Sequence, residues 1–171
     1  MLAARVIDLP AFGDHRGMFV KTFNDSLFRQ MGIDFTVLES YFSISAKDVI
    51  RGMHFQLPPH HHAKIVFCPI GSILDVALDL RRDSPHYGQC FSQVLSAENH
   101  KAFYIPEGFA HGFKALSPDA LTYYLVSSEY DQAHDTGIAY DSIGFDWGAG
   151  EPVLSDRDKQ FIRLADFSSP F

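Results

Sequence analysis

Turn signals recur at short intervals along this chain and limit the length of every regular segment between them. Clear examples are Gly13-Asp14, Pro58-Pro59 and Ser117-Pro118-Asp119. The intervening segments are short and rich in Val, Ile, Phe and Tyr, which favour β-strands. Short strands broken regularly by turns predict an all-β sandwich or barrel. We therefore expect one all-β domain over residues 1–171, with only a few short helices.

Two segments have the signature of a helix. Residues 25–31 follow Asn24, whose side chain is a favourable N-cap. A second helix is expected from Ser155 to about Leu164, because Ser155 can cap it and Asp158 would lie in its first turn, where acidic residues are favourable.

Composition and charge restrict the class of protein. Hydrophobic residues make up 46% of the chain, which excludes a disordered protein. The net charge of −7 argues against broad binding to nucleic acid or to an anionic membrane. No apolar run approaches the roughly 20 residues of a membrane span, and no signal peptide is expected. We expect a soluble cytoplasmic protein with Cys68 and Cys90 reduced, although a disulfide between them is compatible with the sequence.

The parity of residues within the expected strands places polar side chains together. In residues 73–80, Asp75 and Asp79 share the face opposite the aliphatic side chains, because strand residues alternate. Tyr123 and Tyr124 must likewise point to opposite faces of their strand. One face of each strand is therefore polar enough to line a cavity.

Arg51 and His54 have opposite parity, so a plain strand would point them apart. Gly52 lies between them and could host a β-bulge that brings both side chains to one pocket. His54, Lys64 and Asp75 would then supply a base, a cation and a carboxylate to that pocket. Such a set is suited to removing a proton next to a carbonyl.

Seven motifs, taken together and in order, resemble the dTDP-4-dehydrorhamnose 3,5-epimerase family of the cupin superfamily. They are residues 12–17, 51–56 (Arg-Gly-Met-His-Phe-Gln), 63–66, 75–81, 95–99, 105–113 and 154–158. The resemblance implies a cupin-type jelly-roll barrel and a homodimer in which N-terminal strands cross to the partner. It implies a nucleotide-linked 4-keto-6-deoxyhexose as substrate. Epimerisation would proceed without metal or redox cofactor, by deprotonation beside the C4 ketone and reprotonation from the opposite face.

The resemblance also assigns roles to residues of this chain. His54 matches the catalytic base and Asp158 the carboxylate that pairs with it. Lys64 matches the cation that stabilises the enolate oxygen. Tyr124 matches the acid on the opposite face, although Tyr123 beside it is an obvious alternative.

A second set matches positions that bind or orient the substrate. His111 and Asp75 match pocket residues, Arg51 and Tyr130 match groups near the sugar and diphosphate, and Arg16 and Phe19 match residues that reach the nucleotide base across the dimer. The substrate-binding set is completed by Gln56, Glu39 and Tyr41.

The chain departs from the family at positions expected near the ligand. Glu39 and Tyr41 occupy a Gln-x-Asn pair, and Lys21 replaces an acidic residue. A carboxylate in place of a neutral donor disfavours a nearby phosphate. The nucleotide base therefore stays open, as does whether C3, C5 or both are inverted.

Two other hypotheses remain open at this stage. A metal-dependent cupin isomerase or dioxygenase would use His54, one histidine of residues 60–62 and His111, since imidazole suits Zn, Fe or Ni. However, no Glu lies between His54 and Glu98, and Lys64 is a poor neighbour for a cation. We therefore expect no metal, with His60 and His61 in a solvated loop. The third hypothesis is a sugar-binding cupin without catalysis.

Overall fold

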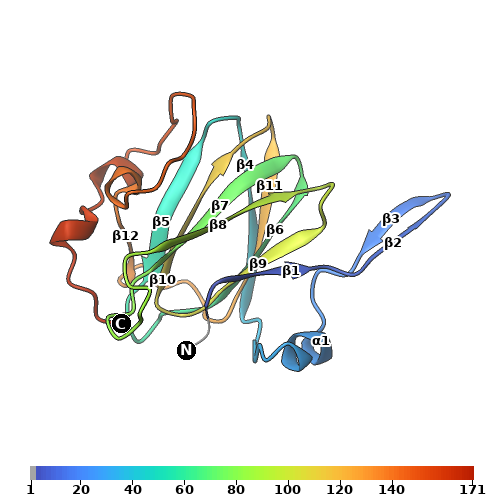
Figure 1. Ribbon diagram of the computed structural model, residues 1–171, viewed down its shortest axis with the longest axis horizontal. Helices are drawn as coiled ribbons and strands as arrows, with labels where there is room; N and C mark the ends of the chain where they lie inside the picture. The colour runs from blue at the N-terminus through green and yellow to red at the C-terminus, as the bar shows by residue number, and fades with distance from the viewer. Residues whose placement is uncertain (1–2) are drawn as a thin grey trace.

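The computed structural model describes residues 3–171 and contains two five-stranded antiparallel sheets that face each other (Figure 1). The first sheet has the order β1-β9-β6-β11-β4 and the second has the order β12-β5-β10-β7-β8. Consecutive strands repeatedly alternate between the sheets, which is the connectivity of a jelly roll. The predicted cupin-type fold is confirmed.

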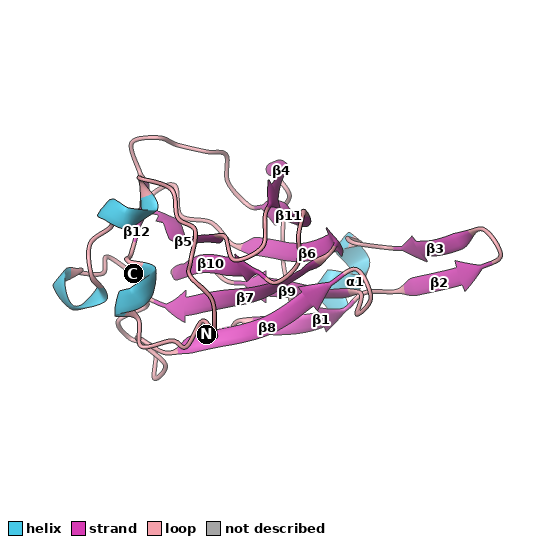
Figure 2. Cartoon of the chain, turned by 90° about the horizontal axis from the view of Figure 1, so that it is seen from above, coloured by secondary structure: helices cyan, strands magenta, loops and turns pink. Residues whose placement is uncertain are grey.

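The strands are short throughout, as the spacing of the turns predicts. The first sheet consists of β1 (Arg5–Asp8), β9 (Lys101–Ile105), β6 (Lys64–Ile70), β11 (Ala120–Val126) and β4 (Glu39–Ser45). The second consists of β12 (Asp135–Gly137), β5 (Ile50–Gln56), β10 (Phe109–Ala115), β7 (Ser72–Asp79) and β8 (Cys90–Ser96). A separate hairpin, β2 (Ala11–Asp14) and β3 (Gly17–Val20), projects away from both sheets (Figure 2).

Only the first of the two expected helices forms. Helix α1 spans Asp25–Gln30, and the Asn24 side chain accepts a hydrogen bond from the Leu27 amide, as an N-cap does. The prediction of a helix over residues 155–164 is wrong. That region contains two isolated 3-10 turns, η2 (Asp158–Gln160) and η3 (Leu164–Asp166), and a third, η1 (Tyr140–Ser142), precedes them. None of the helices in residues 3–171 is long and apolar enough to cross a membrane.

Alternation along each strand divides the side chains between the interior and two outer layers. The interior between the sheets holds Val66, Phe103, Phe113 and Tyr124, which come from both sheets. The outer layers bury two further clusters. One packs α1 and residues 33–35 on the first sheet, and the other packs the C-terminal segment on the second. The cavity-lining faces are therefore those that point inward.

A bulge in β5 interrupts its pairing with β10. His111 pairs with His54, but Phe113 pairs with Arg51, so β5 has one more residue than β10 over this stretch. The extra residue places Gly52 at φ 141, a left-handed conformation. A Cβ atom on Gly52 would lie 2.5 Å from the Cα atom of Gly112. The predicted bulge is present, and it requires glycine.

Replacing Gly52 by Ala should strongly destabilise the protein. The positive φ and the overlap with Gly112 together should lower the free energy of unfolding by about 2–5 kcal/mol. Denaturant unfolding of the wild type and of Gly52→Ala measures this. Gly88→Ala is a matched control, since Gly88 has φ 76 but a Cβ there meets nothing within 4 Å. Equal losses in both variants would show that the contact with Gly112 contributes nothing.

Candidate active site

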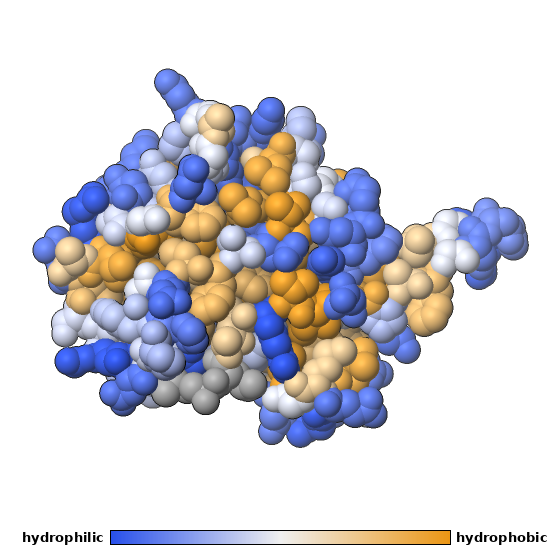
Figure 3. All heavy atoms as spheres, in the orientation of Figure 1, coloured by the Kyte–Doolittle hydropathy of each residue, from blue (hydrophilic) through white to orange (hydrophobic). Residues whose placement is uncertain are grey.

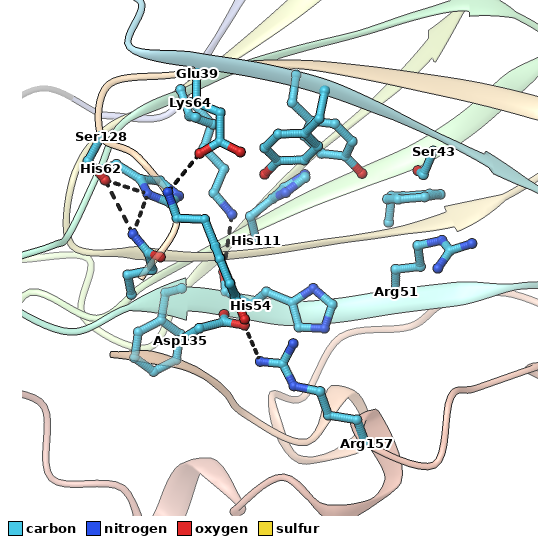
Figure 4. A pocket seen from close by; sticks show the side chains of 17 residues that line it. Glu39, Ser43, Arg51, His54, His62, Lys64, His111, Ser128, Asp135 and Arg157 are labelled. Atoms are coloured by element: carbon cyan, nitrogen blue, oxygen red, sulfur yellow. Dashed lines mark hydrogen bonds and ion pairs between the residues drawn. The ribbon is translucent and has the colours of Figure 1, made fainter. Parts of the chain in front are cut away.

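A cavity of about 340 Å³ opens between the two sheets. Strands β4, β6 and β11 contribute its lining from the first sheet, while β5, β10 and β12 contribute from the second. Charged, imidazole and phenol groups from both sides point into it (Figure 4). Of the residues assigned from the sequence, those that line it are His54, Lys64, Tyr124, Arg51, His111, Gln56, Glu39, Tyr41 and Tyr130.

His54 and Asp158 form a hydrogen-bonded pair at this cavity. The Nε2 atom of His54 lies 2.8 Å from Oδ1 of Asp158, and the Gly52 amide donates to Oδ2 at 3.2 Å. The Asp158 amide is held in turn by Ser155 Oγ at 3.1 Å. Burial alone raises the pKa of the Asp158 carboxyl, but the hydrogen bonds from His54 and Gly52 outweigh it, so the pKa lies below its usual value. A carboxylate at Nε2 fixes the proton of neutral His54 there and leaves the lone pair on Nδ1.

His111 and Asp75 form a second pair, deeper in the interior. His111 Nε2 lies 2.7 Å from Asp75 Oδ1, and both side chains are buried. Burial raises the pKa of Asp75 and lowers that of His111, because a charge on either group is poorly solvated there. Asp75 does not line the cavity but orients His111, which does.

Lys64 presents a buried ammonium to the cavity. Its Nζ atom donates to the His54 carbonyl oxygen at 3.4 Å, and its side chain is only 6% exposed. Burial lowers its pKa to about 8, against the opposing effect of the Asp135 and Asp75 carboxylates. The cation is therefore poorly hydrated, which strengthens its attraction for negative charge that develops nearby.

Tyr124 reaches the cavity from the first sheet. Its ring stacks on Tyr41 with centroids 4.7 Å apart and meets His111 edge-on at 5.9 Å. Burial raises the pKa of Tyr124, and it raises that of Tyr41 to about 12. Both phenols therefore hold their protons at neutral pH. Tyr123 points to the opposite side of β11 and stacks on Phe67 at 5.1 Å.

Arg51 lies on the same side of β5 as His54 because of the bulge between them. Its Nε atom donates to Ser45 Oγ at 3.0 Å, which holds the guanidinium at the cavity wall. The other edge of the guanidinium can still receive an anion, because Arg offers several donors in one plane.

The rim of the cavity contains a network that sequence reasoning did not find. The Gln56 amide nitrogen lies 3.1 Å from Nδ1 of His62, and Ser128 Oγ lies 3.1 Å from the same atom. Burial lowers the pKa of His62 to about 3, so the ring is neutral. His62 lines the cavity, and the available signal was its position two residues before Lys64, which gives the two side chains the same parity.

Glu39 and Tyr130 also meet at the rim. A carboxylate oxygen of Glu39 accepts a hydrogen bond from the Tyr130 amide at 2.7 Å. The carboxylate at this unusual position thus fastens the segment that carries Tyr130, whose side chain is exposed.

Asp135 and Arg157 form an ion pair of 2.7 Å at the opposite side of the cavity. Sequence reasoning missed both residues. Arg157 directly precedes Asp158 in a motif quoted for the family, and this position was the available signal. Ser43 also lines the cavity, from β4.

Arg16 and Phe19 do not line this cavity. Both lie on the projecting hairpin, where they are exposed. Arg16 forms an ion pair with Asp14 of the same hairpin.

The histidines are not arranged as the metal-cupin hypothesis requires. His54 and His111 are each engaged by a carboxylate, and within residues 3–171 they do not cluster with a third ligand. The one group of three potential ligands in that part of the chain is His60, Asp131 and His134. His60 and His61 lie in the loop between β5 and β6 with side chains 40% and 35% exposed, as expected. Each is also next to an acidic residue, since His61 Nε2 lies 3.3 Å from Glu107 and His60 Nε2 lies 3.7 Å from Asp131.

The chain matches known proteins over nearly its whole length. The profile of the dTDP-4-dehydrorhamnose 3,5-epimerase family matches residues 3–166. A protein of that name from Shigella flexneri is 39% identical over 164 residues, which cover 94% of this chain and 91% of the relative. A dTDP-4-dehydrorhamnose 3-epimerase from Streptomyces niveus is 36% identical and covers 90% of this chain and 75% of the relative.

The fold of this chain also matches solved structures over nearly its whole length. The crystal structure of a dTDP-6-deoxy-D-glucose-3,5-epimerase from Legionella pneumophila, in complex with dTDP-4-keto-L-rhamnose, superposes with a TM-score of 0.92 at 35% identity. The match covers 96% of this chain and 89% of that one.

Titration of Lys64 should show how burial and nearby carboxylates oppose each other. The pKa of the amine should be about 8, whereas a free lysine side chain titrates near ~10.4. Asp135→Asn removes a carboxylate that raises the value, so the midpoint should fall further. NMR of the Lys64 side chain, assigned with Lys64→Arg, measures both. A midpoint above about 10 in the wild type would show that the ammonium is well hydrated.

Proposed function

This chain belongs to the dTDP-4-dehydrorhamnose 3,5-epimerase family, and we propose that it epimerises a nucleotide-linked 4-keto-6-deoxyhexose in deoxysugar biosynthesis. The observation that carries this proposal is the placement of His54, backed by Asp158, and of Tyr124 on opposing sheets across one cavity. The proposal treats residues 1–171 as a single epimerase domain.

The first step removes a proton from the carbon beside the C4 ketone. His54 takes the proton on Nδ1, and the C–H electron pair moves into the carbonyl to give an enolate. Asp158 accepts a hydrogen bond from Nε2 and stabilises the imidazolium that forms, as a carboxylate partner does. Its lowered pKa keeps it ionised for this role.

Lys64 stabilises the enolate oxygen. A donor that is aimed at developing negative charge in a dry site is worth about 3–4 kcal/mol. Below a pH of about 8 the amine is protonated and can supply this charge. The His111–Asp75 pair lies beside Tyr124 and fixes the wall against which the sugar is held.

The second step returns a proton to the opposite face of the same carbon. Tyr124 is on β11 in the first sheet and His54 is on β5 in the second, so a sugar ring between the sheets presents one face to each. The phenol gives its proton to the enolate carbon and is restored by solvent. Only protons move in this reaction, so the proposal assigns it no metal or redox cofactor.

Substrate recognition involves the rest of the lining. We assign Arg51 and Tyr130 to the sugar and diphosphate, which their position in the cavity lining together with Gln56, Glu39 and Tyr41 supports. Relatives of this chain include both a 3,5-epimerase and a 3-epimerase. Glu39, Tyr41 and Lys21 leave the nucleotide base open. A panel of substrates would identify that base and show whether C3, C5 or both are inverted.

The proposal includes a homodimer and a cytoplasmic location. The hairpin projects with Phe12, Met18 and Phe19 each more than half exposed, and apolar surface lies along it behind a hydrophilic tip (Figure 3). A partner body would bury these side chains and bring Arg16 and Phe19 to the nucleotide base of its site. Both cysteines are free, which supports a reducing compartment.

Removing the base and the acid should affect different steps. His54→Ala should lower both deuterium uptake from solvent and epimer formation, by about 10²–10⁴-fold. Tyr124→Phe should impair epimer formation more than deuterium uptake, because His54 can still remove a proton and return it to the same face. NMR in D₂O on dTDP-, CDP-, GDP- and UDP-linked 4-keto-6-deoxy sugars measures both quantities together.

Tyr123→Phe is the matched control, since Tyr123 is the adjacent phenol on the opposite side of the strand. It should behave as the wild type. Normal turnover in His54→Ala would remove His54 from the mechanism. Equal losses of exchange and epimerisation in Tyr124→Phe would remove Tyr124 as the separate acid.

Mixing two inactive variants should test whether the hairpin completes the partner's site. A His54→Ala chain and an Arg16→Ala/Phe19→Ala chain can together form a dimer with one intact site. After subunit exchange, about a quarter of wild-type activity should return, because half of the dimers are mixed and each has one working site.

His54→Ala mixed with Lys64→Ala should recover nothing, because both changes affect the body of the chain and every mixed site keeps one defect. Activity in both mixtures, or in neither, would oppose the crossing hairpin. Sedimentation confirms the exchange.

A further inference from the structure

The run of three histidines is only partly used by the proposed function. His62 joins the cavity and His61 lies beside Glu107, whereas His60 turns toward Asp131 and His134 on a neighbouring segment. None of the residues His60, Asp131 and His134 lines the cavity. They form a separate cluster just outside its rim, which we call the rim cluster.

The rim cluster has the dimensions of a transition-metal site. His134 Nδ1 lies 2.7 Å from Asp131 Oδ1, His60 Nε2 lies 3.7 Å from Asp131 Oδ2, and all three ligand atoms fit within 4.8 Å. Ligand atoms around tetrahedral zinc stand about 3.3 Å apart, given metal–nitrogen and metal–oxygen bonds of about 2.0–2.1 Å. The observed separations bracket that value, so small side-chain movements suffice.

The backbone around the cluster is already fixed. Asp131 Oδ1 accepts hydrogen bonds from the Ala133 and His134 amides, which leaves Oδ2 facing His60. Gln56 braces both segments, because its amide nitrogen donates to the His60 carbonyl at 2.7 Å and its oxygen accepts from the Asp131 amide at 2.7 Å. Supports of this kind hold metal ligands in place before the ion binds.

The accessibility of the cluster also suits an exchangeable ion. The side chains of His60, Asp131 and His134 are 40%, 33% and 32% exposed, so an ion can enter from solvent and retain water as its fourth ligand. Two imidazoles and one carboxylate favour Zn²⁺, Ni²⁺ or Cu²⁺ over Mg²⁺ or Ca²⁺.

We propose that His60, Asp131 and His134 form a binding site for a divalent transition metal, with Zn²⁺ as the reference ion, at the rim of the active-site cavity. His134 binds the ion through Nδ1 after its proton moves to Nε2. The ion has no part in proton transfer, because the site lies outside the cavity. It clamps the segment that carries His62 to the one that carries Ser128 and Tyr130.

Zinc titration of chelator-treated, untagged protein tests the site, since a histidine tag would bind the same ions. Calorimetry should show one Zn²⁺ per chain, and Zn²⁺ should raise Tm because it binds the folded state more tightly than the unfolded chain. His60→Ala and His134→Ala should each weaken binding at least about tenfold and remove the Tm shift. Should His134→Ala fold poorly, His134→Gln and Asp131→Asn serve the same purpose.

His61→Ala is the matched control, because it removes a neighbouring histidine from the same run. It should keep both the stoichiometry and the Tm shift. Substitution with Co²⁺ should give a visible spectrum without thiolate charge-transfer bands, which excludes Cys68 and Cys90 as ligands. The proposal is overturned if Zn²⁺ does not bind stoichiometrically, or if binding survives His134→Gln and Asp131→Asn. The cluster would then be only a turn in which Asp131 accepts hydrogen bonds from the Ala133 and His134 amides. Activity of the chelated enzyme tests the proposed function separately.

Discussion

The close approach of Gly52 to Gly112 is the constraint on which the arrangement of the site depends. Neither glycine has a side chain, so the two backbones can approach closely. β5 can therefore carry an extra residue while it stays paired with β10. That residue turns Arg51 and His54 to the same cavity, and its amide binds the carboxylate that holds His54. One glycine thus positions His54, the proposed base, together with its partner Asp158 and the guanidinium of Arg51.

The two sheets then divide the chemistry between them. His54 and its carboxylate lie on one side, while Lys64 and Tyr124 lie on the other, where burial shifts their pKa values in opposite directions. Desolvation disfavours the charged form in both cases, so the amine loses its proton more easily and the phenol less easily. Burial between two packed sheets therefore shifts the protonation equilibria of Lys64 and Tyr124, whereas hydrogen bonds decide that of Asp158.

Strand parity predicted more of this site than helix signals did. Alternation put Tyr123 and Tyr124 on opposite faces and Asp75 on the face opposite the aliphatic side chains, while the choice of Tyr124 came from the family resemblance. A glycine between Arg51 and His54 pointed to the bulge. The helix after Ser155 failed because tertiary packing overrode capping. Ser155 does hold the Asp158 amide, but Phe161 becomes extended and its ring packs against His54. His62, Asp135 and Arg157 were missed because contacts that hold them at the cavity, Ser128 for His62 and the ion pair between Asp135 and Arg157, join separate segments of the chain.

Within a single chain, the projecting hairpin is free of the packing demands that govern the rest of the molecule. Seven of its eight strand residues are exposed in this chain, so substitutions there cost the body little stability. The inward faces of the sheets have no such freedom, because each side chain there is fitted to its neighbours. In the proposed dimer, where the hairpin reaches the partner's ligand, selection for a different ligand can therefore act on the hairpin while the proposed proton-transfer groups stay fixed. New specificities can then evolve on an unchanged catalytic centre.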